Sequence, residues 1–393
     1  MLVLSVNAGS SSLKFTGFKM PAEENLISGY FERIGLKDSF YSIKINGEKI
    51  KKDAVLNTHE DAVKLLVEEL LENKIINSLD EIKLIGHRIV HGGDYFDKTV
   101  IATEEVINKI EELSTLAPLH NPPAVVGIRA FQSIIPTATA TVVFDTAFHQ
   151  TMKEETYMYA LPYDFCEKYK VRRYGAHGTS HKYIAERMAE KLNRNDLKLI
   201  VCHLGSGASI TAIKDGKCVN TSMGFTPNAG LVMGTRCGDI DATILPYLIN
   251  KFNFTPEELD KVMNKQSGYI GISGVGSDSR EIEDGVQEGN ERCILAQNMF
   301  IRRVIDYIAK YYFELEGVDA IVFTAGIGEN AVLTRGEIVK RLAFLGVELD
   351  EQENNFRGEE KLITTPTSSI PVYVVPTNEE LMIARESYEL VKE

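Results

Sequence analysis

Short apolar runs alternate along the chain with segments in which apolar residues recur at helical spacing. The runs cover residues 2–6, 84–90, 140–144, 199–203 and 320–324, and each has the length and composition of a buried strand. An alternation of strands and helices is typical of an α/β protein. The chain has 393 residues, which is enough for more than one domain with its own core.

Several helices can be placed by their start signals. Thr58 stands three residues before Asp61, and Thr255 stands three residues before Glu258 with Pro256 between them. Both patterns predict a capping box, in which the two side chains satisfy free N–H groups of the first turn. Apolar spacing predicts two further helices, over residues 292–315 and 379–391.

A weak internal repeat links residues 2–15 to residues 198–213, at an offset of 196 positions. In each copy an apolar strand enters a turn of small residues, at 9–12 and at 205–209, and a second alternating strand follows. Each copy predicts a β-hairpin, and the pair indicates two related halves. The N–H groups and hydroxyls of such tips can surround phosphate, although Gly/Ser turns also occur simply as turns.

Composition and charge exclude several functions. The formal net charge of −13 makes nonspecific nucleic-acid binding unlikely to be the function, so an anionic ligand needs a local basic site. No run approaches the length of a membrane span, and we expect neither a signal peptide nor a membrane partner. The five cysteines include no CxxC pair, which favours free thiols in the cytoplasm.

The familiar phosphate and metal motifs are absent or weak. The sequence has no GxxxxGK[ST] loop, and the GxGxxA pattern at 326–331 follows a predicted strand near the C-terminal end. We interpret that pattern as a turn that contacts a nucleotide. Histidines four apart occur at 87/91 and 177/181, but the first pair lies in a predicted strand and the second lacks the Glu of HExxH, so we expect no zinc site.

Polar side chains cluster beside predicted strands and glycines at four places. Arg88 precedes Gly92 and Gly93, His120 lies among prolines, Asp145 ends an apolar run, and Arg236 lies between glycines. An Asp at the carboxyl end of a strand is where α/β proteins place ligands. Taken singly, the arginines could form surface ion pairs, Asp145 could cap a helix, and His120 could be a packed loop residue.

The order and context of these residues resemble the acetate kinase family, within the acetate and sugar kinase, Hsc70 and actin superfamily. The matching segments are NAGSSSLKF (7–15), GHRIVHGG (86–93), APLHNPP (117–123), FDTAFH (144–149), YGAHGTSH (174–181), TSMGFTP (221–227), MGTRCGDID (233–241), FTAGIGENA (323–331) and PTNEELMIARE (376–386). The resemblance implies an α/β fold with two duplicated actin-like (ribonuclease H-like) cores flanking an active-site cleft. The implied domains are residues 1–149 with a C-terminal helix at about 380–393, and residues 150–379 with most of the nucleotide site.

The same resemblance implies Mg²⁺-dependent phosphoryl transfer between ATP and acetate, giving acetyl phosphate and ADP, in a homodimer. Mn²⁺ is an alternative metal. The implied catalytic residues are Arg88, His120, Asp145, His177 and Arg236, and the implied acyl pocket is Arg88, Val90, Leu119, Ala176 and Pro227. The implied nucleotide ligands are Asn7, Ser10, Ser12, Lys14, His203, Gly205, Ser206, Gly207, Asp278, Arg280, Gly326, Ile327, Gly328 and Asn330, and the implied metal ligands are Asn7, Asp145 and Glu379. An acidic residue such as Glu379 is also common simply as part of a first helical turn.

The chain departs from the family pattern at five positions. Ser206 replaces the usual Asn and offers one hydroxyl in place of an amide. Ala176 replaces the usual Phe, which predicts a wider acyl pocket and use of propionate or butyrate. Asn220, Asn228 and Ala229 stand where Asp, Leu and Glu are common, and the sequence gives no reason for these changes.

Three other functions stay open at this point. The chain could act mainly on longer acyl groups, as a propionate or butyrate kinase. It could phosphorylate a sugar hydroxyl with Asp145 as the base, or bind ATP as a chaperone-like module without an acceptor. A carboxylate acceptor is already ionised and needs no base, so the arginines are better explained by a carboxylate kinase.

Overall fold

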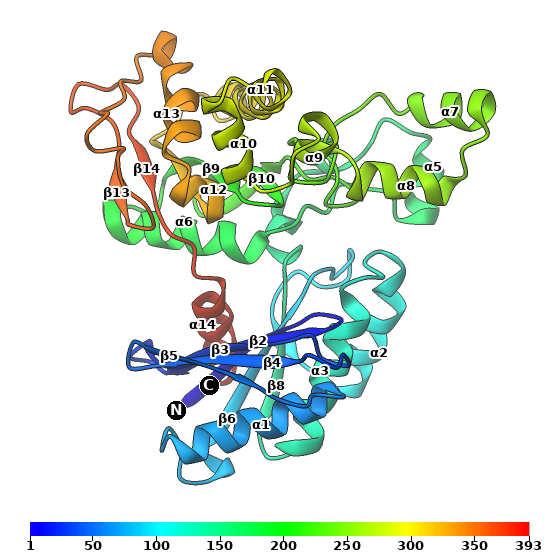
Figure 1. The fold of residues 1–393 in the computed structure, drawn as a ribbon, viewed down its shortest axis with the longest axis vertical. Helices are drawn as coiled ribbons and strands as arrows, with labels where there is room; N and C mark the ends of the chain where they lie inside the picture. The colour runs from blue at the N-terminus through cyan, green and yellow to red at the C-terminus, as the bar shows by residue number, and fades with distance from the viewer. Residues whose placement is uncertain (393) are drawn as a thin grey trace. The chain divides into compact units, whose positions relative to one another are not determined.

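The computed structural model describes residues 1–392, which form two compact units (Figure 1). The first unit contains Met1–Phe148 together with the C-terminal segment from Asn378, and the second contains His149–Thr377. Each unit has a mixed β-sheet covered by helices, so the predicted α/β class is confirmed. None of the helices within residues 1–392 combines the length and apolar character needed to span a bilayer.

The first unit is built on an eight-stranded sheet in the order β5-β4-β3-β2-β1-β6-β8-β7. Its strands are β1 (Leu2–Ala8), β2 (Ser12–Lys19), β3 (Glu24–Glu32), β4 (Phe40–Ile45), β5 (Glu48–Asp53), β6 (Ile82–Ile89), β7 (Val100–Ile101) and β8 (Thr139–Phe144). Strands β1 to β5 form antiparallel hairpins, whereas β1, β6 and β8 run parallel to one another. Parallel strands bring their carboxyl ends to one edge of the sheet.

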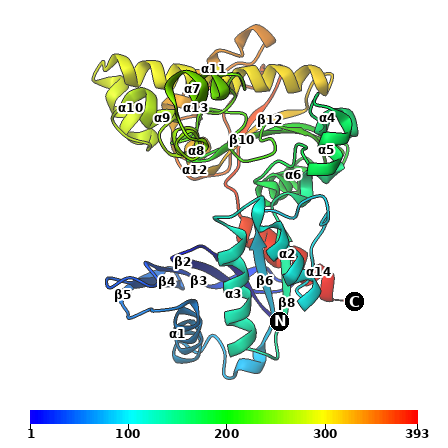
Figure 2. The same ribbon diagram turned by 90° about the vertical axis from the view of Figure 1, so that its right-hand side faces the viewer.

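Helices cover both faces of this sheet (Figures 1 and 2). The helices are α1 (His59–Glu72), α2 (Glu104–Glu112), α3 (Asn121–Ile134) and α14 (Glu379–Val391). Leu4 and Val6 of β1 belong to the core beneath α1 and α3, while Ser5 between them donates a 2.5 Å hydrogen bond to the Glu380 carbonyl of α14. Successive strand residues point to opposite faces, so α14 covers the face opposite α1 and α3.

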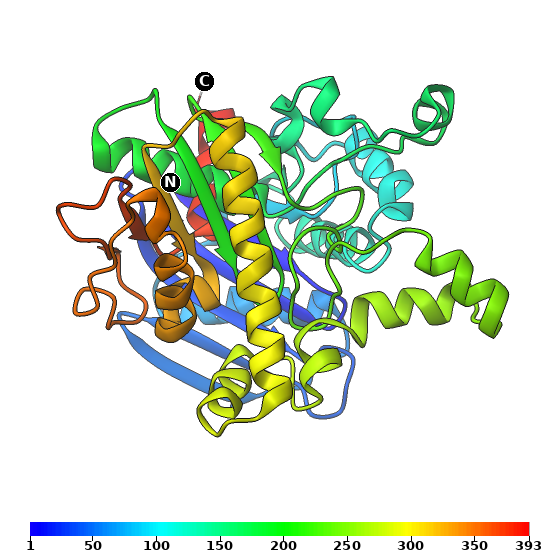
Figure 3. The same cartoon turned by 90° about the horizontal axis from the view of Figure 1, so that it is seen from above.

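The second unit is built on a six-stranded sheet in the order β11-β10-β9-β12-β14-β13. Its strands are β9 (Lys198–Leu204), β10 (Ala208–Lys214), β11 (Lys217–Thr221), β12 (Ala320–Thr324), β13 (Lys361–Leu362) and β14 (Val372–Val374). Its helices are α4 (Glu154–Tyr157), α5 (Tyr163–Tyr169), α6 (Gly178–Leu192), α7 (Ile244–Phe252), α8 (Pro256–Lys265), α9 (Gly268–Ser273), α10 (Ser279–Gln287), α11 (Glu291–Glu314), α12 (Ala325–Asn330) and α13 (Val332–Lys340). The long helix α11, yellow in Figure 3, lies across the strands and buries Phe300, Val304 and Ile308.

The two sheets share one strand pattern. In each, an antiparallel hairpin contributes its first strand to a parallel pair, β1 with β6 in the first unit and β9 with β12 in the second. The orders β3-β2-β1-β6-β8 and β11-β10-β9-β12-β14 are therefore equivalent. This equivalence supports the duplication predicted from the repeat at offset 196.

Most predicted elements are confirmed, with two differences. The capping boxes at Thr58 and Thr255 are present, and helices α11 and α14 lie within a residue of their predicted bounds. The segment predicted as a turn at 326–331 is instead mostly the short helix α12, because it packs closely on the sheet: a Cβ atom at Gly328 would lie 3.3 Å from the carbonyl carbon of Phe323. Strands β3, β4 and β5 were not predicted, because their apolar signal is weak.

Gly86 of β6 sets how closely α14 approaches the sheet. A Cβ atom at this position would lie 2.7 Å from Ile383 Cγ2 and even closer to Ser387 Oγ. We expect Gly86→Ala to destabilise the protein by about 1–3 kcal/mol through overpacking, measured as a lower midpoint of thermal unfolding. Ser387→Ala on the Gly86→Ala background removes the nearest atom and should recover part of the loss; no recovery would contradict this explanation.

Candidate active site

Arg88 and Asp145 meet at the carboxyl ends of two neighbouring parallel strands of the first unit. Arg88 lies near the end of β6, and Asp145 directly follows β8, with its backbone N–H bonded to the Ile89 carbonyl at 2.9 Å. Arg88 Nη2 lies 2.5 Å from Asp145 Oδ2, and Arg88 Nε lies 3.1 Å from both carboxylate oxygens. This fork fixes both side chains, and Asp145 is only 1% exposed.

Two more carboxylates and a lysine surround this pair. Glu379 and Glu380 form the first turn of α14, and Lys14 forms an ion pair with Glu380. Burial raises the pKa of Glu379; Arg88 opposes this rise, while Asp145 and Glu380 add to it. Burial opposes the charge on Arg88, but Asp145, Glu379 and Glu380 together raise the pKa of Arg88 above its ordinary value. The three carboxylates outnumber the two cations, so this site has an excess of negative charge.

A cavity of about 400 Å³ opens beside these groups. Its lining residues are Asn7, Gly9, Ser12, Lys14, Tyr30, Glu32, Arg88 and His120. Five of the residues predicted by resemblance, Asn7, Ser12, Lys14, Arg88 and His120, therefore share one cavity. The predicted ligand Ser10 is not among its lining residues, and its side chain is exposed in the turn between β1 and β2.

The donor set beside Arg88 has the chemistry that Mg²⁺ requires. Mg²⁺ prefers carboxylate and carbonyl oxygens, uses one or two carboxylates, and completes its shell with waters and substrate phosphates. Asn7, Asp145 and Glu379 supply such oxygens, and a bound cation would oppose the rise in the pKa of Glu379 that burial chiefly, and Asp145 and Glu380 in addition, produce. Within residues 1–392, no group of three His, Cys, Asp or Glu side chains forms a complete metal site, so the substrate would have to supply part of the shell.

His177 and Arg236 come together over Gly207 in the second unit. His177 is the N-cap residue of α6 and has a left-handed backbone with φ of 58°. A Cβ atom at Gly207 would lie 3.4 Å from Arg236 Nη1 and 3.6 Å from His177 Nε2. The absence of a side chain at position 207 therefore lets a guanidinium and an imidazole face the same small volume.

Arg236 is a partly buried cation without an anionic partner within residues 1–392. Its Nη1 donates to the Pro227 carbonyl at 3.3 Å and contacts Met233 Sδ at 3.7 Å. Among the described residues no carboxylate forms an ion pair with it, and burial lowers its pKa. A buried charge without a counter-charge is costly, and an anionic ligand would relieve that cost.

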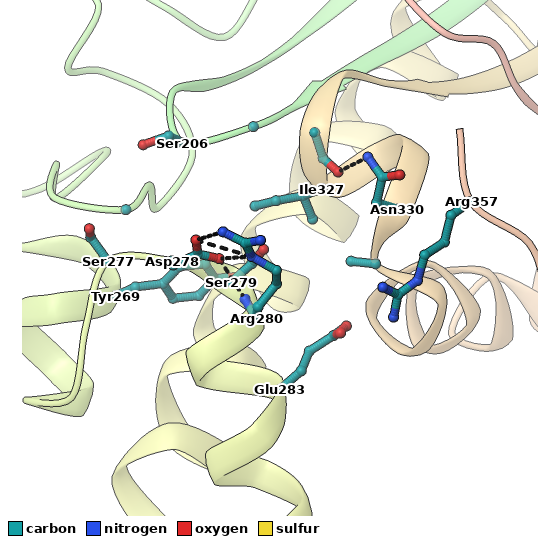
Figure 4. Close-up of a pocket in the computed structure, with 14 residues that line it drawn as sticks. Ser206, Tyr269, Ser277, Asp278, Ser279, Arg280, Glu283, Ile327, Asn330 and Arg357 are labelled. Carbon is teal, nitrogen blue, oxygen red and sulfur yellow. Dashed lines mark hydrogen bonds and ion pairs between the residues drawn. The ribbon is translucent and has the colours of Figure 1, made fainter. Parts of the chain in front are cut away.

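A larger cavity, of about 500 Å³, lies between the β9–β10 turn and helices α10 and α12 (Figure 4). It is lined by Gly205, Ser206, Gly234, Tyr269, Ser277, Asp278, Ser279, Arg280, Glu283, Gly326, Ile327, Asn330, Ala331 and Arg357. Its volume is within the usual range for a small-molecule site. Six predicted nucleotide ligands besides Gly205 line it, namely Ser206, Asp278, Arg280, Gly326, Ile327 and Asn330.

Local hydrogen bonds shape this cavity. Asp278 caps α10 and holds Arg280 through Nη2–Oδ2 and Nε–Oδ1 contacts of 2.6 and 3.0 Å, which lowers the pKa of Asp278 to about 2. Asn330 donates to the Gly326 carbonyl at 2.9 Å (Figure 4). The Ser206 carbonyl accepts from Gly234 N–H at 3.0 Å, and the Ser206 hydroxyl lies beside Gly234, where a Cβ atom would be 3.2 Å from it.

Sequence reasoning missed several lining residues, of which Arg357 and Glu283 carry charge. Arg357 lies in an irregular segment with no motif, so no sequence signal could have identified it. Of the nucleotide ligands predicted in the second unit, three do not line this cavity: His203 stacks on His177 at 4.1 Å between ring centroids, Gly207 lies beneath His177, and Gly328 packs on the sheet.

The four predicted acyl-pocket residues other than Arg88 differ in their surroundings. In the first unit, Val90 is partly buried after β6 and Leu119 is 66% exposed. In the second unit, Pro227 contacts Arg236 through its carbonyl, and Ala176 is buried in the core cluster, where its carbonyl contacts His149 Nε2 at 2.9 Å. Ala176 directly precedes His177, the N-cap residue of α6.

Two of the three unexplained sequence departures now have a structural reason. Asn220 Nδ2 donates to both carboxylate oxygens of Glu314, at 2.9 and 3.1 Å, where an Asp would be repelled. Asn228 contacts the Cys237 sulfur at 3.5 Å and so links two parts of the loop that carries Arg236. Nothing in the structure explains Ala229.

Comparison with known proteins gives one consistent result. The family model of the acetokinase family matches residues 2–385. The acetate kinase of Geobacillus kaustophilus is 52% identical over 390 residues, which cover 99% of this chain and 98% of that protein. The acetate kinase of Bacillus subtilis is 51% identical over 392 residues, which cover 99% of both chains.

Solved structures agree with the sequence relatives. The crystal structure of Porphyromonas gingivalis acetate kinase matches with a TM-score of 0.94 and 44% identity, covering 99% of each chain. The crystal structure of a propionate kinase from Francisella tularensis matches with a TM-score of 0.93 and 42% identity, covering 99% of this chain and 100% of that one. The whole chain, rather than one of its units, is therefore similar to these short-chain acyl kinases.

The surroundings of Glu379 predict a pH-dependent stability. Because its pKa is raised in the folded chain above the ordinary 4.5, Glu379 contributes stability at low pH that is lost as the pH rises through the raised pKa. Glu379→Gln should therefore raise the unfolding midpoint near neutral pH in metal-free buffer, with a smaller difference at acid pH.

Glu360 is a control for which we expect the opposite change in the unfolding midpoint. Burial tends to raise its pKa, but hydrogen bonds from Arg187 and Lys191 outweigh burial and lower it. Glu360→Gln should therefore lower the midpoint near neutral pH. A neutral-pH destabilisation by Glu379→Gln equal to that by Glu360→Gln would contradict the charge analysis.

Proposed function

Because the chain belongs to the acetokinase family, we propose that it transfers the γ-phosphoryl group of ATP directly to acetate. It is a phosphotransferase with a carboxyl group as acceptor. An acetate oxygen attacks the γ-phosphorus, a new O–P bond forms, and the bond from that phosphorus to the β-phosphate oxygen breaks. The products are acetyl phosphate and ADP, and the reaction is reversible.

The observation that carries this proposal is the unpaired guanidinium of Arg236 beside His177. The acceptor carboxylate and the γ-phosphoryl group are both anions and repel each other, so transfer requires fixed positive charge around the moving group. Arg236 is partly buried, lacks a carboxylate partner among the described residues, and faces the same volume as His177 Nε2. An anion bound there would supply the counter-charge that Arg236 lacks.

Arg88 and His120 have a related role in the proposal. Both line the 400 Å³ cavity of the first unit, and the Asp145 fork holds Arg88 in a fixed orientation with its charge retained. We assign Arg88 to the acceptor carboxylate and an equatorial phosphoryl oxygen, and His120 to the phosphoryl group. Val90, Leu119, Ala176 and Pro227 are assigned to the methyl end of acetate.

Mg²⁺ fits the residues around Glu379, with Mn²⁺ as an alternative. Asn7, Asp145 and Glu379 would hold the ion together with ATP oxygens, and Glu379 would then remain ionised. When bound, Mg²⁺ neutralises charge on the β- and γ-phosphates. Ser10, Ser12 and Lys14 are assigned to the phosphates on the same side.

The nucleoside is assigned to the cavity of Figure 4, so the second unit would carry most of the nucleotide site. This cavity has the size for a nucleoside, and charged groups lie around it on α10 and on the loop that carries Arg357. His203, Gly205, Ser206 and Gly207 are assigned to the phosphate side of the β9–β10 turn. Ser206 offers its hydroxyl where an amide is usual, so phosphate contact there is expected to be looser.

The sugar kinase alternative is disfavoured by the state of Asp145. A base must accept a proton from a sugar hydroxyl, but Arg88 donates to both oxygens of this carboxylate. The chaperone-like alternative provides no acceptor carboxylate for Arg88 or Arg236 to bind. A carboxylate acceptor accounts for both arginines.

Assembly and location are further parts of the proposal. We propose a homodimer, and the exposed apolar residues of α7 and its flanks are the surface that a second copy would cover: Ile240, Ile244, Tyr247, Ile249, Phe252 and Phe254. All five cysteines are free thiols, which fits a reducing cytoplasm.

A hydroxamate assay for acyl phosphate, with ATP, Mg²⁺ and acetate, tests this function. We expect acetate-dependent product, and a loss of about 100- to 1,000-fold in kcat for Arg236→Ala, because a fixed cation is removed from the transition state. Arg88→Ala should reduce kcat by a similar factor. Arg88→Lys keeps a positive charge beside buried Asp145, so it tests whether charge alone supports turnover. Arg187→Ala is a control in a surface ion pair. Near-normal turnover in both alanine variants would contradict the assignment.

Ala176 is proposed to widen the acceptor range. We expect Ala176→Phe to shift kcat/KM toward acetate and away from propionate and butyrate, by about 10-fold per methylene. Because Ala176 is buried, Ala176→Val serves as a smaller step, and thermal unfolding checks that each variant folds. Unchanged ratios among the three acids in folded variants would exclude this role.

A further inference from the structure

Four histidines gather in the second unit, and the proposed function uses His177 for the transfer and His203 for phosphate binding, which leaves His149 and His181 without a role. Between ring centroids, His149 lies 5.8 Å from His181, His181 lies 6.0 Å from His203, and His203 lies 4.1 Å from His177. His181 is completely buried in the first turn of α6, so it cannot contact substrate directly. The question is what this buried imidazole does for His177.

Ser209 joins the two rings. It lies on β10, is completely buried, and its Oγ is 3.0 Å from His177 Nδ1 and 2.8 Å from His181 Nε2. A serine hydroxyl has one proton to donate and can also accept. No other hydrogen bond of the Ser209 hydroxyl is present among the described residues, so its proton goes to one of these two rings.

The unpaired nitrogen of His181 decides which ring receives that proton. His181 Nδ1 is buried without a hydrogen-bond partner, and burial holds the pKa of His181 well below its ordinary value, so the ring is neutral. If Ser209 donated to His181 Nε2, the His181 proton would lie on Nδ1 as a buried N–H without an acceptor. Buried N–H groups without a partner are rarer than buried acceptors without one.

The favoured arrangement therefore runs in one direction. His181 Nε2–H donates to Ser209 Oγ, and the Ser209 hydroxyl donates to His177 Nδ1. His177 then carries its own proton on Nε2, the atom that lies beside Gly207 and Arg236. An imidazole in this form is a hydrogen-bond donor at Nε2 without requiring a positive charge.

We infer that Ser209 and His181 are positioning residues, which fix His177 in the tautomer that presents an Nε2–H donor to the transferring phosphoryl group. The inference rests on the proposed function, in which His177 contacts that group. It assigns a role to Ser209, which sequence spacing did not single out, and to His181, whose spacing from His177 was considered only for a zinc site. Neither residue touches the substrate; both act through His177.

Ser209→Ala tests this inference without removing an imidazole. We expect the kcat for acetyl phosphate formation to fall about 10- to 100-fold, as for other partners that orient a functional histidine, with KM for ATP nearly unchanged. Ser209→Thr keeps the hydroxyl and should retain most of the activity. Thr211→Val is the matched control, because Thr211 is also buried on β10 but bonds Thr221 Oγ1 at 2.9 Å, away from the histidines.

The tautomer itself is measured by ¹H–¹⁵N long-range NMR of ¹⁵N-histidine-labelled full-length protein, with His177 assigned by the spectrum of His177→Asn. In the native chain and in Ser209→Thr we expect His177 to be protonated at Nε2 and unprotonated at Nδ1. In Ser209→Ala we expect a mixture of the two tautomers. A proton on Nδ1 in the native chain, or an unchanged spectrum and kcat in Ser209→Ala, would overturn the inference. Absence of acetate kinase activity in the native chain would instead refute the proposed function, which the NMR result does not require.

Discussion

Repulsion between two anions is the constraint that explains the arrangement of charge in this protein. A carboxylate cannot approach a phosphoryl group unless fixed cations offset the repulsion, and cations are costly to bury. The two units differ in how they offset the free-energy cost of a buried arginine. Arg88 is held by Asp145 at the edge of the first sheet, whereas Arg236 in the second unit has no carboxylate of its own among the described residues. The protein thus has one arginine whose charge is balanced by a neighbouring carboxylate and one that has no carboxylate partner among the described residues.

The folds of the two units explain why these groups lie where they do. Each sheet places a parallel pair beside a hairpin with a small-residue tip, so side chains at the carboxyl ends of strands lie near exposed backbone N–H groups. Arg88 and Asp145 use the first sheet in this way, and Gly205 and Ser206 use the tip of the second hairpin. Duplication of one strand pattern thereby provides two sets of anion-binding groups, which then diverged in sequence.

Local signals made much of the fold predictable. The hairpins at 2–15 and 198–213, the capping boxes and the helix at 379–391 depend on neighbouring residues, so the sequence was sufficient. Strand β5 was missed because all six of its residues are exposed and it is held by pairing with β4. Helix α12 was read as a turn because its glycines oppose helix formation, and only packing against the sheet overrides them.

The site was predictable only where motif resemblance covered it. Asp278 and Arg280, named by resemblance, line the cavity of Figure 4, whereas Arg357, which also lines it, has no local signal. The contact of Ser209 with His177 and His181 joins residues on different elements, and no spacing rule brings them together. The effect of burial on Glu379 is likewise a property of the folded chain rather than of the sequence.

Helix α14 belongs to the first unit but is synthesised after the second unit. The first unit lacks this helix until the second unit has been translated, although Ser5 and Gly86, which receive it, precede the second unit in the sequence. Domains generally begin to fold as they emerge from the ribosome, so one face of the first sheet must wait, uncovered, through translation of the entire second unit. Glu379 and Glu380 arrive with this final helix, and a truncated chain released early would therefore lack both carboxylates. The charge cluster around Arg88 therefore cannot form until the second unit has been translated.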